Sequence, residues 1–308
     1  MVSHDATRRH DADPTRHPRR FSLTDGSRWR RIALALALAV VVAGVTALIP
    51  PRTRAAGTFV GVKTYYLALG DSLAFGYEPN LDWSHGYAQK WNTDLQQHGS
   101  KSFTNYGCNG ETSATFINGG CPFAFALHNF YAGAQLNAAV NFLKAHPGQV
   151  SPVSLDIGAN DLLPDINSST CAISSTWATD LANLDARLTG TILPKLAAAL
   201  TVNGARSGDL VMMNYYDPFQ NQCASNPQVL ANLQTLNQHI AQDAAQFSVP
   251  VADVFTAFGG TTTPNPNICS YTWMCASQHD IHATGGQSGE PGNGYGVIAG
   301  AFESLSGY

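Results

Sequence analysis

The chain has 308 residues, of which 44% are apolar and 12% are charged, and its formal net charge at pH 7 is -4. This length and composition are typical of a globular protein with one large α/β domain or two small ones. The charge is uneven, because ten arginines and four aspartates precede Gly57. From Gly57 onward 7 basic and 17 acidic residues remain, a net charge of -10. So acidic a region argues against nucleic acid and other polyanions as partners.

Residues 1–57 have the pattern of a targeting segment. Arg30 and Arg31 precede an apolar run over residues 32–49, which is followed by two prolines and by small residues at 55–57. This pattern is typical of a cleaved export signal. The run also just reaches the length that spans a bilayer, so a retained signal-anchor is the alternative. In either case we expect residues 58–308 to be secreted or to face the outside of the cell. Membrane contact would come only through an uncleaved N-terminal segment.

Strand-like and helix-like stretches alternate after this segment. The expected strands cover residues 64–69, 102–106, 153–157, 209–214 and 249–254. The expected helices cover residues 87–97, 134–145, 176–200, 228–245 and 295–305. This alternation predicts one α/β domain over residues 58–308, a three-layer α/β/α sandwich with a central parallel sheet. Pro194 should kink the longest helix or split it in two.

Four polar motifs accompany these elements. GDSL at 70–73 follows the first expected strand, and NYGCNGET at 105–112 follows the second. DIGAND at 156–161 closes the third strand, and HDIHAT at 279–284 lies near the C-terminus. Because ligands of open α/β sheets bind at the carboxyl edge of the strands, we expect the first three motifs to line a site there.

A serine and a histidine among these motifs are candidates for nucleophilic catalysis. A serine hydroxyl is a poor nucleophile unless a base lies within hydrogen-bond reach, so Ser72 would need such a partner. His282 is the candidate base, since a histidine can take and return a proton near neutral pH. The alternative is structural, because Asp71-Ser72 could simply cap a helix.

The four motifs, in this order, resemble those of the SGNH or GDSL hydrolases over residues 65–301. The chain looks similar to the secreted, actinobacterial-type esterase and lipase branch of that family. The resemblance implies that the backbone N–H of Ser72, Gly110 and the side-chain amide of Asn160 form an oxyanion hole. It also implies an SGNH fold, and we expect Asp161 to hold the loop of the asparagine.

The histidine motif departs from the family's usual form. Where the family commonly has an aspartate three residues before the histidine, this chain has His279, and Asp280 stands two residues before His282. Three arrangements remain open: Asp280 orients His282, a backbone carbonyl does so, or His279 is the base. We favour His282 with Asp280 as its orienting group.

The glycine-rich stretch at 285–294 follows this motif directly, and its composition predicts a loop. We interpret it as a flexible surface insertion, with a mobile rim of the substrate cleft as the alternative.

Six cysteines lie in the region expected to be exported. An even number in an oxidising compartment indicates three disulfides, for which the sequence allows fifteen pairings. No metal is expected, because neither a C-x-x-C nor a His/Cys cluster with ligand spacing occurs. Extracellular members of the resembled family often pair their cysteines sequentially, which here implies Cys108–Cys121, Cys171–Cys223 and Cys269–Cys275.

The resemblance implies a secreted serine hydrolase that cleaves a small-molecule or lipid ester through an acyl-enzyme on Ser72. We expect a monomer that needs neither cofactor nor metal. A lipid or acyl ester is the favoured substrate, and a carbohydrate O-acetyl ester is the alternative within the same chemistry. From a different class, the displaced aspartate leaves a catalytically decayed cell-surface binding domain as a further alternative.

Overall fold

The structure is a computed structural model that describes residues 59–308. The expected export signal or anchor at 1–57 lies outside the described residues and stays a prediction. Across residues 59–308 the helices are all too short or too polar to cross a membrane. The described residues belong to one compact unit, Arg54–Tyr308.

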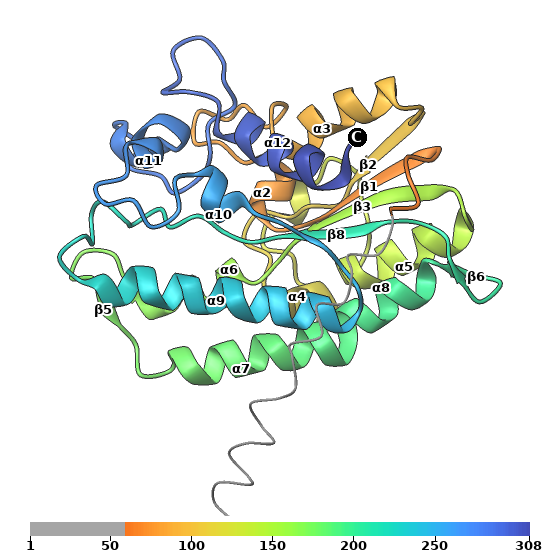
Figure 1. The fold of residues 1–308 in the computed structure, drawn as a ribbon, viewed down its shortest axis with the longest axis horizontal. Coiled ribbons are helices and arrows are strands. Elements are labelled where there is room, and N and C mark those ends of the chain that lie inside the picture. Colours follow the sequence, from red (N-terminus) through yellow and green to blue (C-terminus); the bar gives the residue numbers. More distant parts are fainter. Residues whose placement is uncertain (1–58) are drawn as a thin grey trace, which may run out of the picture. The chain divides into compact units, whose positions relative to one another are not determined.

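A five-stranded parallel sheet forms the centre of this unit (Figure 1). Its order is β2 (Ser102–Asn105), β1 (Tyr65–Gly70), β3 (Val150–Asp156), β8 (Leu210–Met213) and β9 (Val251–Ala252). All four neighbouring pairs run parallel. Every residue of β3 and β8 is buried, as expected for a parallel sheet that is covered on both faces. The predicted three-layer α/β/α fold is therefore confirmed.

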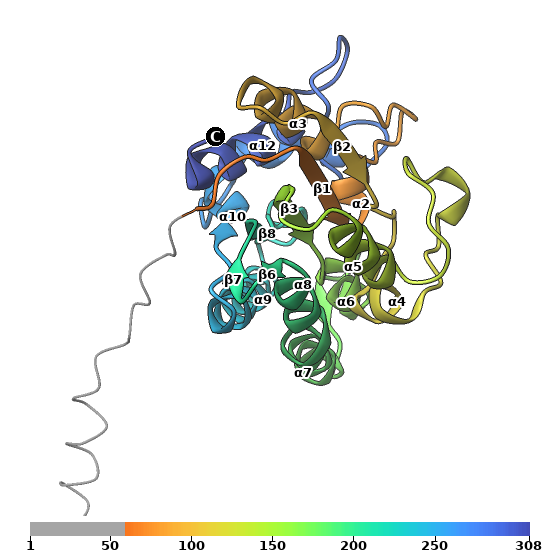
Figure 2. The same cartoon turned by 90° about the vertical axis from the view of Figure 1, so that its right-hand side faces the viewer.

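Helices cover both faces of the sheet, as Figures 1 and 2 show. One face carries α3 (Tyr87–Gln97), α10 (Val254–Ala257) and α12 (Gly294–Ser306). The other face carries α5 (Gln135–Ala145), α7 (Trp177–Arg187), α8 (Leu193–Ala199) and α9 (Pro227–Gln246). The aromatic rings of Tyr87 and Phe302 stack 5.1 Å apart and join α3 to α12.

Short elements connect these layers. The short helices are α2 (Ser72–Phe75), α4 (Ser113–Asn118), α6 (Ala159–Leu162) and α11 (Pro266–Tyr271). The 3₁₀ turns are η1 (Ala124–Ala126), η2 (Leu163–Asp165) and η4 (Trp273–Cys275). Two small hairpins pair β4 (Ile166–Asn167) with β5 (Ala172–Ile173) and β6 (Thr201–Val202) with β7 (Ala205–Arg206).

Two expected elements differ in detail from the structure. The helix predicted over residues 176–200 is interrupted by a π-helical turn, η3 (Leu188–Ile192), which lies between α7 and α8. Pro194 lies in the first turn of α8, where its missing N–H costs least. The strand predicted over residues 249–254 is shorter, because Asp253 accepts a hydrogen bond from the Thr256 N–H and begins α10.

The six cysteines form three disulfides with the sequential pairing. Cys108 joins Cys121, Cys171 joins Cys223, and Cys269 joins Cys275, with Cα atoms 6.1, 5.5 and 5.0 Å apart. The pairs close loops with sequence separations of 13, 52 and 6 residues.

Removing the disulfides should destabilise the protein in the order of loop length. Each disulfide lowers the entropy of the unfolded chain, so removing it should lower the free energy of unfolding. The expected cost is about 4 kcal/mol for Cys171–Cys223, about 3 for Cys108–Cys121 and about 2 for Cys269–Cys275. Paired Cys→Ser variants compared by urea denaturation would measure this ranking. An equal cost for the shortest and the longest loop would contradict the chain-entropy account.

Candidate functional site

The first three polar motifs meet at the carboxyl edge of the sheet, where β1 and β3 end side by side. The turn after β1 is tight, because Gly70 pairs directly with Asp156 at the end of β3. A Cβ atom on Gly70 would lie 2.1 Å from the Asp156 carbonyl oxygen, and the φ angle of Gly70 is +138°. Only glycine fits this position, so the turn that presents the next two residues depends on it.

Ser72 is the first residue of α2, and its side chain is not the cap of that helix. Asp71 caps the helix by accepting a hydrogen bond from the Leu73 N–H at 2.9 Å. The Ser72 hydroxyl lies 3.5 Å from the same Asp71 oxygen, and the residue is 7% exposed. Within Asp71-Ser72 it is therefore the aspartate, and not the serine, that caps α2.

Asp280 and His282 form a close pair. Nδ1 of His282 lies 2.6 Å from Oδ1 of Asp280, and the same oxygen accepts the His282 backbone N–H at 2.9 Å. Although burial opposes ionisation, the hydrogen bond from His282 lowers the pKa of Asp280 below its ordinary value. His279 is exposed, and its Nδ1 lies 3.2 Å from the Met274 carbonyl oxygen. Of the three arrangements that the sequence leaves open, this geometry corresponds to Asp280 with His282.

Three contacts hold the histidine loop. The Trp273 N–H donates to the His282 carbonyl at 3.0 Å, and the Tyr216 hydroxyl donates to the Ile281 carbonyl at 2.7 Å. The ring of Tyr77 packs 4.6 Å from the imidazole of His282. These contacts come from three separate segments, so the position of the imidazole depends on the assembled fold.

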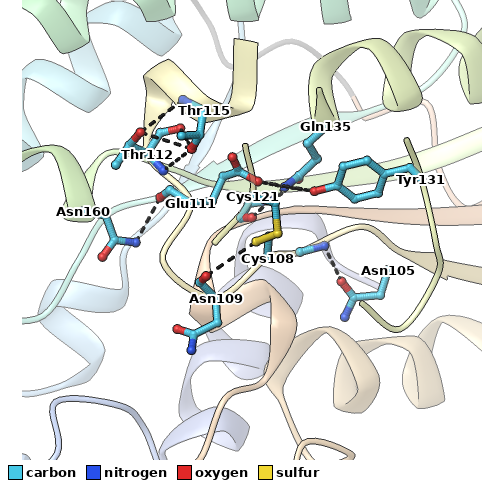
Figure 3. The surroundings of a disulfide bond; sticks show 12 residues. Asn105, Cys108, Asn109, Glu111, Thr112, Thr115, Cys121, Tyr131, Gln135 and Asn160 are labelled. Carbon is cyan, nitrogen blue, oxygen red and sulfur yellow. Dashed lines mark hydrogen bonds between the residues drawn. A yellow bond between two sulfur atoms is a disulfide. The ribbon is translucent and has the colours of Figure 1, made fainter. Parts of the chain in front are cut away.

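Asn160 and Gly110 come from the loops after β3 and β2. Nδ2 of Asn160 donates a hydrogen bond to the Glu111 carbonyl at 3.0 Å, which fixes the orientation of the amide (Figure 3). Gly110 has a φ of +81°, and the disulfide between Cys108 and Cys121 closes its loop. Among residues 59–308 the backbone N–H groups of Ser72 and Gly110 have no acceptor.

Asp161 has the supporting contacts expected of it. It accepts hydrogen bonds from the Ser113 N–H at 2.8 Å and from the Ser113 hydroxyl at 2.6 Å. It also pairs with Arg187 at 3.1 Å. Asp161 therefore joins the asparagine loop to α4 and α7.

A cavity adjoins these residues. Ser72, Asn160 and His282 line it together with Asp71, whereas Gly110 is not part of its wall. Most of the remaining wall is apolar and consists of Leu162, Leu163, Ile166, Trp177, Phe219, Leu233, Leu236 and Ile281.

A buried pair of carboxyl groups, Asp71 and Asp156, lies at the turn that carries Ser72, and the role of Asp156 was not predicted from the sequence. Asp156 is fully buried and accepts hydrogen bonds from the Asp71 N–H at 3.2 Å, the Ala74 N–H at 3.1 Å and the Tyr87 hydroxyl at 2.5 Å. The Tyr215 hydroxyl donates to Asp71 at 2.9 Å. Burial and the neighbouring Asp71 carboxylate raise the pKa of Asp156 well above its ordinary value. The only sequence signal was an acidic residue in a strand that is otherwise uncharged.

Glu78 is a second residue that the motifs did not indicate. Its Oε2 accepts hydrogen bonds from the Trp273 indole at 3.1 Å and from the Gly285 N–H at 2.7 Å. The side chain therefore joins the loop after α2 to the two segments that flank His282. Burial raises the pKa of Glu78 to about 7.

Comparison with known proteins gives a family and a fold. Residues 68–282 match the model of the GDSL-like Lipase/Acylhydrolase family. Among solved structures, an acetylxylan esterase from Geobacillus stearothermophilus is 15% identical, with a TM-score of 0.52, and the match covers 82% of this chain and 97% of that one. At this identity the likeness concerns the fold alone.

Two solved Streptomyces structures are also similar. An extracellular lipase from Streptomyces rimosus is 19% identical, with a TM-score of 0.48, over 77% of this chain and 99% of that one. A phospholipase A1 from Streptomyces albidoflavus is 19% identical, with a TM-score of 0.47, over 78% and 99%. No curated protein matches the chain. The actinobacterial branch of the family stays a prediction.

Asp156→Asn should gain stability over the wild type as the pH rises. The folded state keeps a proton on Asp156 that the unfolded state releases above about pH 4, so the wild-type free energy of unfolding falls with increasing pH. Asparagine keeps a neutral acceptor and removes this dependence. Thermal unfolding of both proteins from about pH 3 to pH 8 would measure the difference.

Asp253→Asn is the matched control with the opposite sign. Although burial opposes ionisation, hydrogen bonds from Asn214 and Thr256 lower the pKa of Asp253. This variant should lose stability relative to the wild type as the pH rises through the acid range below about 5. A difference between wild type and Asp156→Asn that stays constant with pH would mean that Asp156 is ionised in the fold.

Proposed function

The chain belongs to the GDSL-like lipase/acylhydrolase family, and from this premise we propose that it is a serine hydrolase of carboxylic esters. The observation that carries the proposal is that Ser72, Asn160 and His282 line one cavity while Asp280 engages His282. The proposed substrate is a lipid or another acyl ester. The proposed location is outside the cell, which three disulfides within the described residues support.

Ser72 is the proposed nucleophile, and His282 is its proposed base. Because Asp280 occupies Nδ1 of His282, Nε2 is the nitrogen left to take the proton of the serine hydroxyl. Asp280 would hold the imidazole in that tautomer and stabilise the imidazolium as it forms. The serine oxygen attacks the ester carbonyl, and the protonated His282 gives its proton to the leaving alcohol. Water, activated by the same histidine, then releases the acid.

The oxyanion hole is proposed to consist of the backbone N–H groups of Ser72 and Gly110 and the Asn160 amide. The free N–H groups of Ser72 and Gly110 support this role, because a preorganised donor without an acceptor can bind the developing charge at little reorganisation cost. One of the two Asn160 amide hydrogens is donated to the Glu111 carbonyl. That bond leaves the second amide hydrogen for the oxyanion.

The apolar wall of the cavity favours an acyl chain over a sugar. A carbohydrate needs several polar groups around it, whereas the wall beside Ser72 is formed mainly by aliphatic and aromatic side chains. Burial of an acyl chain there would gain about 0.8 kcal/mol for each methylene. An acetyl ester would leave this surface unused.

Substitutions at the proposed triad should separate catalysis from binding. Ser72→Ala should abolish turnover of p-nitrophenyl butyrate, and Asp280→Asn should lower kcat by about 10²- to 10⁴-fold, because the imidazole loses its orienting carboxylate. Labelling by a fluorophosphonate should vanish in Ser72→Ala. A wild-type protein that neither turns over the ester nor becomes labelled would instead be the non-catalytic binding domain.

Narrowing the apolar cavity should change acyl-length preference. Leu163→Trp fills part of the wall, so it should reduce kcat/KM for the octanoyl ester at least about tenfold while acetyl ester turnover stays within about twofold. Leu230→Trp on α9 is the control, because Leu230 is not part of this wall. An acetyl optimum in the wild type, unchanged by Leu163→Trp, would favour the O-acetylesterase alternative.

A further inference from the structure

A cluster of three carboxylates lies beside the histidine loop and has no part in the proposed reaction. Glu78 and Asp82 come from the loop after α2, and Glu290 comes from the glycine-rich loop before α12. One carboxylate oxygen from each residue lies within 4.8 Å of the other two. Two oxygens that bind one Ca²⁺ at about 2.4 Å can be at most twice that distance apart. The three oxygens are therefore close enough to share one calcium ion.

Glu78 gives an independent indication of a ligand. Its side chain is fully buried, and its Oε1 has no hydrogen-bond partner, whereas Oε2 has two. A carboxylate oxygen without a partner in the interior costs free energy, so such an atom requires an explanation. A cation held by the same carboxylate would supply the missing interaction.

The cluster has no direct ion pair with a lysine or arginine within the described part of the chain. No lysine or arginine of residues 59–308 forms an ion pair with any of the three carboxylates, and only Asp82 has an ion-pair partner, His85, at 2.7 Å. Lys90 is close enough for all three carboxylates to favour its charged form, although its burial opposes that charge. Three ionised carboxylates this close repel one another, and a cation between them would relieve that repulsion.

Oxygen-bearing side chains alternate along the first loop. In Glu78-Pro79-Asn80-Leu81-Asp82, every second residue carries a side-chain oxygen. Asn80 already contacts the second loop, because its Nδ2 donates to Glu290 Oε1 at 3.0 Å. The donor set is thus made of oxygens from two loops, the type of set that hard cations prefer over zinc or copper.

We propose that Glu78, Asp82 and Glu290 bind a calcium ion. Calcium fits better than magnesium, because carboxylates from two separate loops supply an irregular set of oxygens more readily than a strict octahedron. Extracellular calcium modules commonly have dissociation constants of about 10⁻⁴ to 10⁻³ M, and we expect an affinity in that range.

A calcium ion at this position would join the loop that follows Tyr77 to the glycine-rich loop that follows His282. Glu78 directly follows Tyr77, whose ring packs on His282, and its Oε2 accepts the Gly285 N–H, three residues after that histidine. Glu290 lies in the same glycine-rich loop and binds the Gly286 and Gln287 N–H groups through its other oxygen, Oε2. The glycine-rich loop would thus be a calcium-held support of the site.

The test measures binding and stability, so it does not depend on the proposed activity. The protein is treated with EDTA, dialysed, and titrated with CaCl₂ by calorimetry, and its melting temperature is measured with up to 10 mM CaCl₂. At 10 mM CaCl₂, about ten- to a hundredfold above the expected dissociation constant, the melting temperature should rise by about 3 °C or more. Asp82→Asn and Glu290→Gln should each weaken binding at least about tenfold.

Asp94→Asn is the matched control, since Asp94 and Glu303 form an acidic pair away from the cluster. It should keep the full calcium response. No binding heat and no shift in the wild type would overturn the proposal. So would an equal loss of response in Asp94→Asn, or an equal shift with MgCl₂ at the same concentration. Calcium binding by a protein that lacks esterase activity would support this site while contradicting the proposed function.

Discussion

The arrangement of the site depends on the contact between the ends of β1 and β3. Gly70 lies against the Asp156 carbonyl with no room for a Cβ atom, and the buried Asp156 carboxyl accepts the backbone N–H groups of Asp71 and Ala74. Because these groups start α2, a side chain of the central strand fixes the turn that carries Ser72. Burial of this carboxyl is tolerated because it is hydrogen-bonded and its raised pKa keeps it neutral.

The loops around this turn are held by long-range contacts. A disulfide closes the Gly110 loop, Asp161 joins the asparagine loop to α4 and α7, and Glu78 joins the serine side of the site to the histidine side. Catalytic groups on loops need such support, since a displacement of about 1 Å can cost a hundredfold in rate. The proposed calcium ion would add one more contact of this kind.

Local patterns predicted most of the fold. The segments at 64–69 and 153–157 became central strands, and they are rich in apolar residues because a parallel sheet is buried on both faces. Boundaries were less accurate where a single side chain decides them. Asp253 ends the last strand early by capping α10, and Pro194 lies in the first turn of α8, which follows a π-helical turn.

The sequence by itself determined the α/β class, the family and the four motifs, because apolar periodicity and short motifs are properties of neighbouring residues. Only the tertiary structure decided that the Asp280 carboxylate rather than a backbone carbonyl contacts Nδ1 of His282, and that Asp71 rather than Ser72 caps α2. It also brought Glu78 to Gly285, 207 positions away. Such contacts depend on how loops from separate strands meet at one edge of the sheet. Residues so far apart in the sequence leave no local pattern that would predict the contact.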